Sequence, residues 1–155
     1  MPRHLSQMIR TLRTYFALLL AIAAACPAAI AADEVPPAVA AARAQAEKFA
    51  EDGYTFREDH WESLVSPKKG KGIRIQLFKG HEYRICVAAE PGSGAKIVSH
   101  VLGAEGKPIE DENEVLAEGT AVNIRVSPEK TGVHIILVRQ DGEEEVQCAM
   151  VIGYR

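Results

Sequence analysis

Three cysteines, Cys26, Cys86 and Cys148, carry the most reactive side chains of this 155-residue chain. A thiol can pair in a disulfide, bind a metal or act as a nucleophile, depending on its neighbours and its compartment. The sequence has no Cys-x-x-Cys pair, and neither Cys86 nor Cys148 stands at an apparent helix start, where its pKa would be lowered. The pattern therefore disfavours a catalytic cysteine.

The first 32 residues have the pattern of a secretory signal peptide. Three arginines precede an apolar run over 16–26, and Ala29-Ile30-Ala31 supplies the small-x-small motif of a cleavage site. We therefore expect a periplasmic or secreted protein. Two alternatives stay open, because the run could be kept as an anchor, or Cys26 could be lipidated, since residues 23–26 are a degraded version of a lipoprotein box.

Cleavage after Ala32 would leave Cys86 and Cys148 as the remaining cysteines. Two cysteines in an exported chain usually pair, and both lie in strand-like runs. We predict a disulfide between them, with two buried free thiols as the alternative.

Histidines and serines show no catalytic spacing. His81, His100 and His134 are far apart and form no HExxH motif, and no serine lies in a GxSxG elbow. We expect no catalytic residues, no metal and no cofactor. A hydrolase would require His100 or His134 beside a nucleophile and an acid in one cleft.

The densest acidic run is 110–114, Glu-Asp-Glu-Asn-Glu. Carboxylates at this density could hold calcium, but the spacing does not match an EF-hand loop. We expect a solvated loop and leave calcium binding open.

Trp61 and Phe78 are the candidate ligand-binding aromatics. A lone Trp in a small β domain is usually part of the core. Phe78 lies on the opposite strand face from Leu77, so it could be exposed. If Trp61 and Phe78 form an open shelf, binding of a small ligand or carbohydrate is favoured.

Charge argues against nucleic acid as a partner, and hydropathy argues against a membrane-spanning segment in the processed chain. The chain has 18 basic and 21 acidic residues. Removing three arginines with the signal gives 15 − 21 = −6, so nucleic acid is disfavoured as a partner. The sequence has no second apolar run of about 18 residues, so we expect no transmembrane segment after processing.

Hydrophobic periodicity divides the rest of the chain into a helix and strands. Pro36-Pro37 and Gly53 bound an Ala-rich helix over about 37–52, which could pack on the domain or protrude. Alternation then predicts strands, and Asp141-Gly142 is typical of a hairpin turn. The predicted strands are 73–78, 83–88, 97–102, 122–126, 133–139 and 146–152.

Residues 72–154 resemble the bacterial pre-peptidase C-terminal type of domain. Three segments carry the resemblance through their strand–turn–strand patterns: 73–85, 101–108 and 126–134. The resemblance implies a jelly-roll-like β-sandwich, and family members are mostly non-catalytic appendages of secreted enzymes. Gly103 stands where the family often has Asp, so no acidic ligand is implied there.

These patterns predict a mainly-β protein, an antiparallel jelly-roll-like β-sandwich with one N-terminal α-helix. We expect a signal peptide over 1–32, a tail and helix over 33–53 and a sandwich over 54–155. The expected function is a non-catalytic module that binds an envelope or secreted protein. The alternative is a small-ligand or carbohydrate-binding module.

Overall fold

A computed structural model describes residues 34–155. The predicted signal peptide and Cys26 therefore lie outside the described residues. Val35–Arg155 forms one compact unit, in which the helix and the strands belong together. Among the described residues, no helix has the length and hydropathy needed to cross a membrane.

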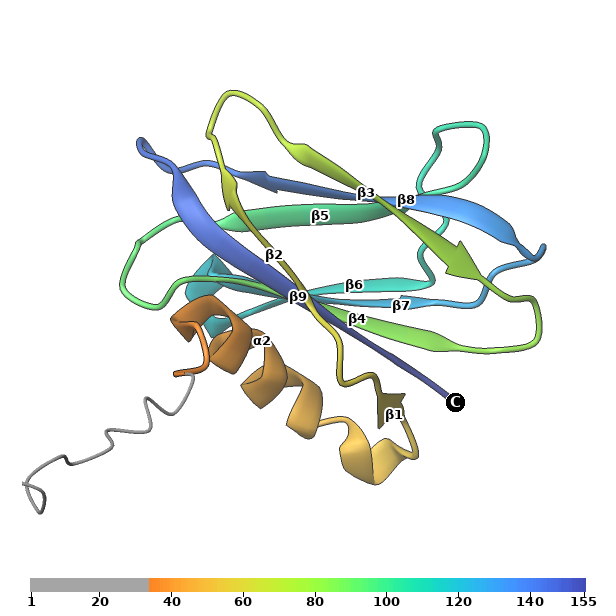
Figure 1. Ribbon diagram of the computed structural model, residues 1–155. Coiled ribbons are helices and arrows are strands. Elements are labelled where there is room, and N and C mark those ends of the chain that lie inside the picture. Colours follow the sequence, from red (N-terminus) through yellow and green to blue (C-terminus); the bar gives the residue numbers. More distant parts are fainter. Residues whose placement is uncertain (1–33) are drawn as a thin grey trace, which may run out of the picture. The chain divides into compact units, whose positions relative to one another are not determined.

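Two antiparallel sheets pack face to face, which confirms the predicted sandwich (Figure 1). The large sheet has the order β1-β9-β4-β7-β6, with β2 also paired to β9, and the small sheet has the order β3-β8-β5. The strand bounds are β1 Thr55–Phe56, β2 Trp61–Val65, β3 Lys71–Leu77, β4 Tyr83–Ala89, β5 Ile97–Leu102, β6 Glu112–Leu116, β7 Ala121–Val126, β8 Gly132–Gln140 and β9 Val146–Tyr154.

The core between the sheets consists of the inward residues of both. Leu77, Ile85, Ile124 and Ile136 are fully buried there. Alternation places these residues on the inner face of each strand, because successive side chains of a strand point to opposite sides.

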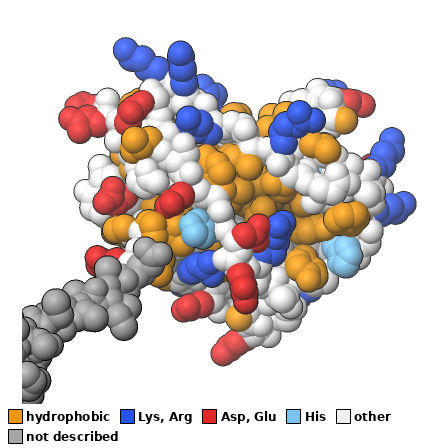
Figure 2. Space-filling view, viewed as in Figure 1, with side chains coloured by type: hydrophobic (Ala, Val, Ile, Leu, Met, Phe, Trp, Pro, Cys, Tyr) orange, Lys and Arg blue, Asp and Glu red, His pale blue; other side chains and the backbone are white. Residues whose placement is uncertain are grey.

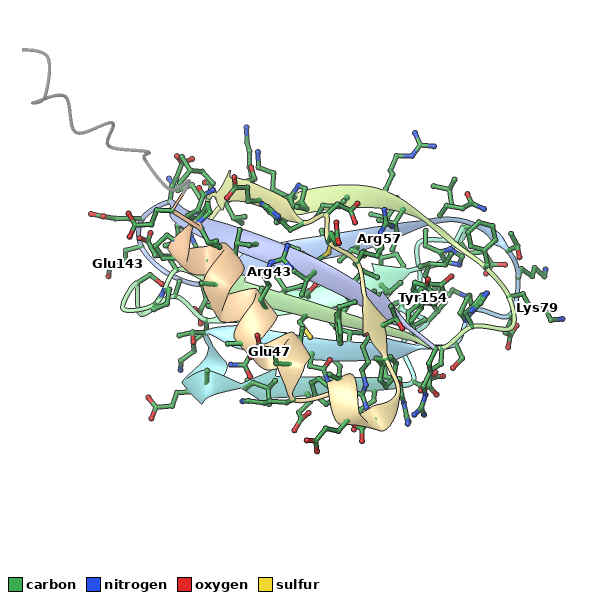
Figure 3. The ribbon with its side chains drawn as sticks, turned by 60° about the horizontal axis from the view of Figure 1, so that its bottom comes forward. Arg43, Glu47, Arg57, Lys79, Glu143 and Tyr154 are labelled. Carbon is green, nitrogen blue, oxygen red and sulfur yellow. The ribbon has the colours of Figure 1, made fainter. Side chains whose placement is uncertain are left out.

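Helix α2, Pro37–Glu47, packs on the outer face of the large sheet (Figures 1 and 3). The proline at its start suits the first helical turn, where a backbone donor is not needed. A short 3₁₀ helix, Ala50–Asp52, follows and ends at Gly53, whose φ of 87° favours glycine. The structure thus shows that the predicted helix packs rather than protrudes.

The connections between strands differ from the sequence prediction at 141–145. Asp141-Gly142 does not close a hairpin, because β8 belongs to the small sheet and β9 to the large one. Gln140 fixes this crossing: its side-chain nitrogen donates to the carbonyls of Val65 (3.0 Å) and Glu144 (2.7 Å). Within residues 34–155, β6 and β7 follow each other in the chain and pair directly, so they form a hairpin.

Candidate functional site

The sandwich opens where β2 and β3 separate. β2 joins the large sheet by pairing with β9, and after the turn at 66–70 the chain enters β3, the end strand of the small sheet. Two adjoining hollows, of about 450 and 480 Å³, lie along this opening. Figure 2 shows hydrophobic side chains gathered in the middle of the view, in the region where Figure 1 draws β2 and β9 beside β3. We call this opening the seam groove.

The seam groove has an apolar floor and two aromatic walls. Ile73 and Ile75 of β3 and Met150 and Ile152 of β9 line its floor. Trp61 and Phe78 line the same hollow, and Phe78 continues into the second one. The structure thus brings the two predicted aromatic residues to one surface.

Trp61 and Phe78 differ in burial. Trp61 alternates with exposed Glu62 on β2, points inward, and packs partly buried against the core between the sheets. Phe78 follows inward-facing Leu77 and is 50% exposed. Its backbone N–H donates to the hydroxyl of Tyr83 (3.0 Å), which fixes the chain where β3 ends. Trp61 therefore serves both as the edge of the core and as a wall of the groove.

An aromatic cluster closes one end of the seam groove. The rings of His81, Tyr83 and Tyr154 lie 5.7–6.4 Å apart, centroid to centroid. Tyr83 and Tyr154 are direct cross-strand partners of β4 and β9. Such aromatic pairs stabilise a sheet and present a firm surface.

Basic groups border the apolar floor. Arg57 and Arg74 line the groove, together with His60 and the acidic Asp59. Arg57 binds Asp59 through two contacts, Nε to Oδ1 at 2.8 Å and NH2 to Oδ2 at 2.7 Å. The sequence analysis missed this border, because Arg57 follows β1 of the large sheet, Arg74 lies on β3 of the small sheet, and no spacing in the sequence relates them.

The predicted disulfide between Cys86 and Cys148 is wrong. Both are free thiols: Cys86 lies under α2 and Cys148 lies in the core between the sheets, so they occupy opposite faces of the large sheet. Cys148 pairs with Ala89, which is three residues along β4 from Cys86. The two cysteines are therefore about 10 Å apart along the strands, which is beyond the reach of a disulfide. Burial raises the pKa of Cys86 to about 12 and that of Cys148 to about 11, so neither is a reactive nucleophile.

The acidic run 110–114 is largely exposed to solvent, as expected, but most of it is a strand rather than a loop. Glu112, Asn113 and Glu114 belong to edge strand β6, and Glu112 lies 3.4 Å from Arg84 and 3.5 Å from Arg125. Within residues 34–155, no three His, Cys, Asp or Glu side chains are grouped for a metal ion.

The histidines of the strands have separate partners. The ring Nδ1 of His100 lies 2.5 Å from Oε1 of Glu110, and that of His134 lies 2.9 Å from the carbonyl of Gly132. Burial acts to raise the pKa of Glu110, but the hydrogen bonds from His100 and the backbone outweigh it and lower that pKa. Each histidine is thus accounted for by a local contact.

A polar cluster fastens the end of β9 to the segment before β1. The hydroxyl of Tyr54 donates to Glu82, and Arg155 binds the same carboxylate at 2.8 Å. The hydrogen bond from Tyr54 lowers the pKa of Glu82, whereas burial raises the pKa of Tyr54. This arrangement stabilises the fold beside the groove and holds Tyr154 in place.

A comparison with protein-family models and a search of curated proteins both find no match for this chain, so the resemblance to the pre-peptidase C-terminal type of domain stays a prediction.

Proposed function

We propose that this protein is an exported, non-catalytic binding module of the bacterial envelope, and that a segment of a protein partner binds in its seam groove. The single observation that carries the proposal is an open apolar floor, walled by Trp61 and Phe78, between the edges of two sheets. A contiguous exposed apolar patch, rimmed by polar residues, typically marks an interaction site. Export itself rests on the signal-like pattern of residues 1–32.

The described side chains support binding rather than catalysis. At the groove Asp59 is held by Arg57, and away from the groove the thiols of Cys86 and Cys148 are buried with raised pKa values. The groove offers instead what binding sites typically contain, a hydrophobic surface with a few polar groups at its border.

A small ligand or carbohydrate is the second candidate, because Trp61 and Phe78 line the same hollow. Sugars bind the faces of aromatic rings, and Arg57 and Gln76 at the border could hydrogen-bond hydroxyl groups. The arrangement favours this candidate less, since Trp61 is partly packed into the core.

Site-specific photo-crosslinking in the native cells tests the proposal. A benzophenone amino acid replaces Phe78 in the groove, and in a matched control it replaces Val98, which is 48% exposed on the outer face of the small sheet. We expect one protein adduct from position 78, lost when Trp61→Phe or Ile75→Asp is added, and none from position 98. Equal adducts from both positions, or adducts that survive both groove substitutions, would contradict it.

Trp61 provides a second readout, because it is the only Trp of the sequence. Its fluorescence reports occupancy of the groove without labelling. A change on adding oligosaccharides, together with no protein adduct from position 78, would favour the carbohydrate-binding module instead.

A further inference from the structure

We propose that the occupant of the seam groove is an extended polypeptide segment that pairs with the free edge of β3 and alternates apolar with acidic residues. This inference rests on the proposed function and adds to it the binding mode and the chemistry of the partner.

The edge of β3 offers unpaired backbone groups. Within residues 34–155, β3 pairs with β8 on one side and is the last strand of its sheet on the other. A seven-residue edge strand presents alternate N–H and C=O groups outward, which is a template for one more strand. Strand addition of this kind is a recurring mode of peptide recognition.

The inner side of β3 is incompletely covered at this edge. Ile73 and Ile75 point inward yet remain partly exposed, whereas their β8 partners Ile136 and His134 are buried. No further strand of the described chain lies beyond β3 to cover them. An added strand would place every second side chain over this floor, so those side chains should be apolar.

The remaining side chains of the added strand would lie beside a basic group. Arg74 alternates with Ile73 and Ile75 and points away from the core, whereas Arg57 at the border of the groove is already bound by Asp59, so the charge argument rests on Arg74. Opposite charges across neighbouring strands stabilise pairing, and like charges oppose it. A second copy of β3, paired antiparallel about the middle of the strand, would bring Arg74 against itself, so charge favours an acidic partner over self-pairing.

Synthetic peptides test this inference on the isolated protein. The probe is a nine-residue peptide of alternating Val and Glu with blocked ends, titrated while Trp61 fluorescence is recorded. Three controls match it: alternating Val and Lys, alternating Ser and Glu, and a depsipeptide in which esters replace the amides and remove the backbone donors. We expect the Val–Glu peptide to bind, and each control to bind at least roughly tenfold more weakly.

Charge reversal on the protein gives a matched pair of variants. Arg74→Glu should weaken binding of the Val–Glu peptide about tenfold and strengthen binding of the Val–Lys peptide. Arg139→Glu should change neither, because Arg139 lies on β8, four positions beyond the partner of Arg74. Circular dichroism and thermal melting of each variant confirm that the fold is retained.

The outcomes separate the inference from the proposed function. If the depsipeptide binds as well as the peptide, strand pairing is wrong while groove binding stands. If no peptide binds but position 78 still crosslinks to a protein in a Trp61-dependent way, the alternating acidic strand is wrong and the interaction module stands. If neither peptide binding nor crosslinking is found, both are wrong.

Discussion

The outer faces of the two sheets differ in how they are covered. Small residues of β4 and β9, including Cys86, Ala88 and Ala149, lie under the Ala-rich face of α2, and small side chains on both sides let the helix approach closely (Figure 3). On the small sheet, Val98 and Val133 are 48% and 47% exposed. The chain therefore covers the strands that are apolar on both faces and leaves bare the sheet whose strands alternate.

The largest expected effect is the difference in stability between two variants, one with a charge at the covered outer face of the large sheet and one with a charge at the bare outer face of the small sheet. Val39→Asp, on the face of α2 that packs against the large sheet, should destabilise the protein by about 3–5 kcal/mol or prevent folding, because it buries a charge without a partner. Val98→Asp should cost about 1 kcal/mol or less, because its side chain is half-exposed on the outer face of the small sheet and an added charge there stays in contact with water. Urea unfolding followed by circular dichroism measures both. A similar cost for the two variants would mean that the bare face is covered in solution.

The two cysteines sharpen the comparison, because they lie on the two sides of one sheet. We expect iodoacetamide to label neither thiol in the native protein and to label both after denaturation without reductant, counted by mass spectrometry. Cys86→Ser and Cys148→Ser should each cost about 1–3 kcal/mol, because a hydroxyl replaces a thiol in a buried site. A denatured, unreduced protein that shows no free thiols would restore the disulfide that the structure contradicts.

Much of the fold follows from local patterns in the sequence. Alternation over 73–78 and 83–88 predicts strands where β3 and β4 lie. In β3 the inward and outward positions differ in polarity, and in β4 the large residues face the core while the small Cys86 and Ala88 face α2. Pro37 and Gly53 mark the two ends of the helical segment, because proline suits the first turn of a helix and glycine adopts the positive φ at which the segment ends. Strand β6 was missed, because most of its residues are exposed on both faces and no alternation marks them.

Pairing between strands, and therefore the site, could not be predicted in this way. The turn at 141–145 has favourable hairpin residues, yet the strands beside it find partners in different sheets. Trp61 and Phe78 were identifiable as aromatic residues, but the groove they share also needs Arg57 and Ile152, which come together through tertiary packing. The cysteine prediction was wrong for the same reason, since the face on which each thiol lies depends on register.

The smallest expected effect is the loss of stability at low pH that comes from Glu110, the partner of His100 on β5. The pKa of Glu110 is lowered in the folded protein, so its ionised form contributes stability above its unfolded pKa, and this contribution is lost as pH falls below about 4.5. Glu110→Gln should therefore flatten the decline of melting temperature between about pH 5 and pH 3, whereas Glu114→Gln, exposed on β6, should leave it unchanged. Equal slopes for Glu110→Gln and the unaltered protein would contradict this role.

The position of β9 in the large sheet has a consequence for the order of folding. This strand is synthesised after the other eight, yet it lies between β4 on one side and β1 and β2 on the other. Until residues 146–154 exist, β1 and β2 have no strand to join, and most other pairings link segments far apart in the chain. Such topologies fold slowly, because long loops must close before contacts form. The growing polypeptide thus cannot complete its large sheet until β9 has been synthesised, because β9 is the strand that joins β1 and β2 to β4.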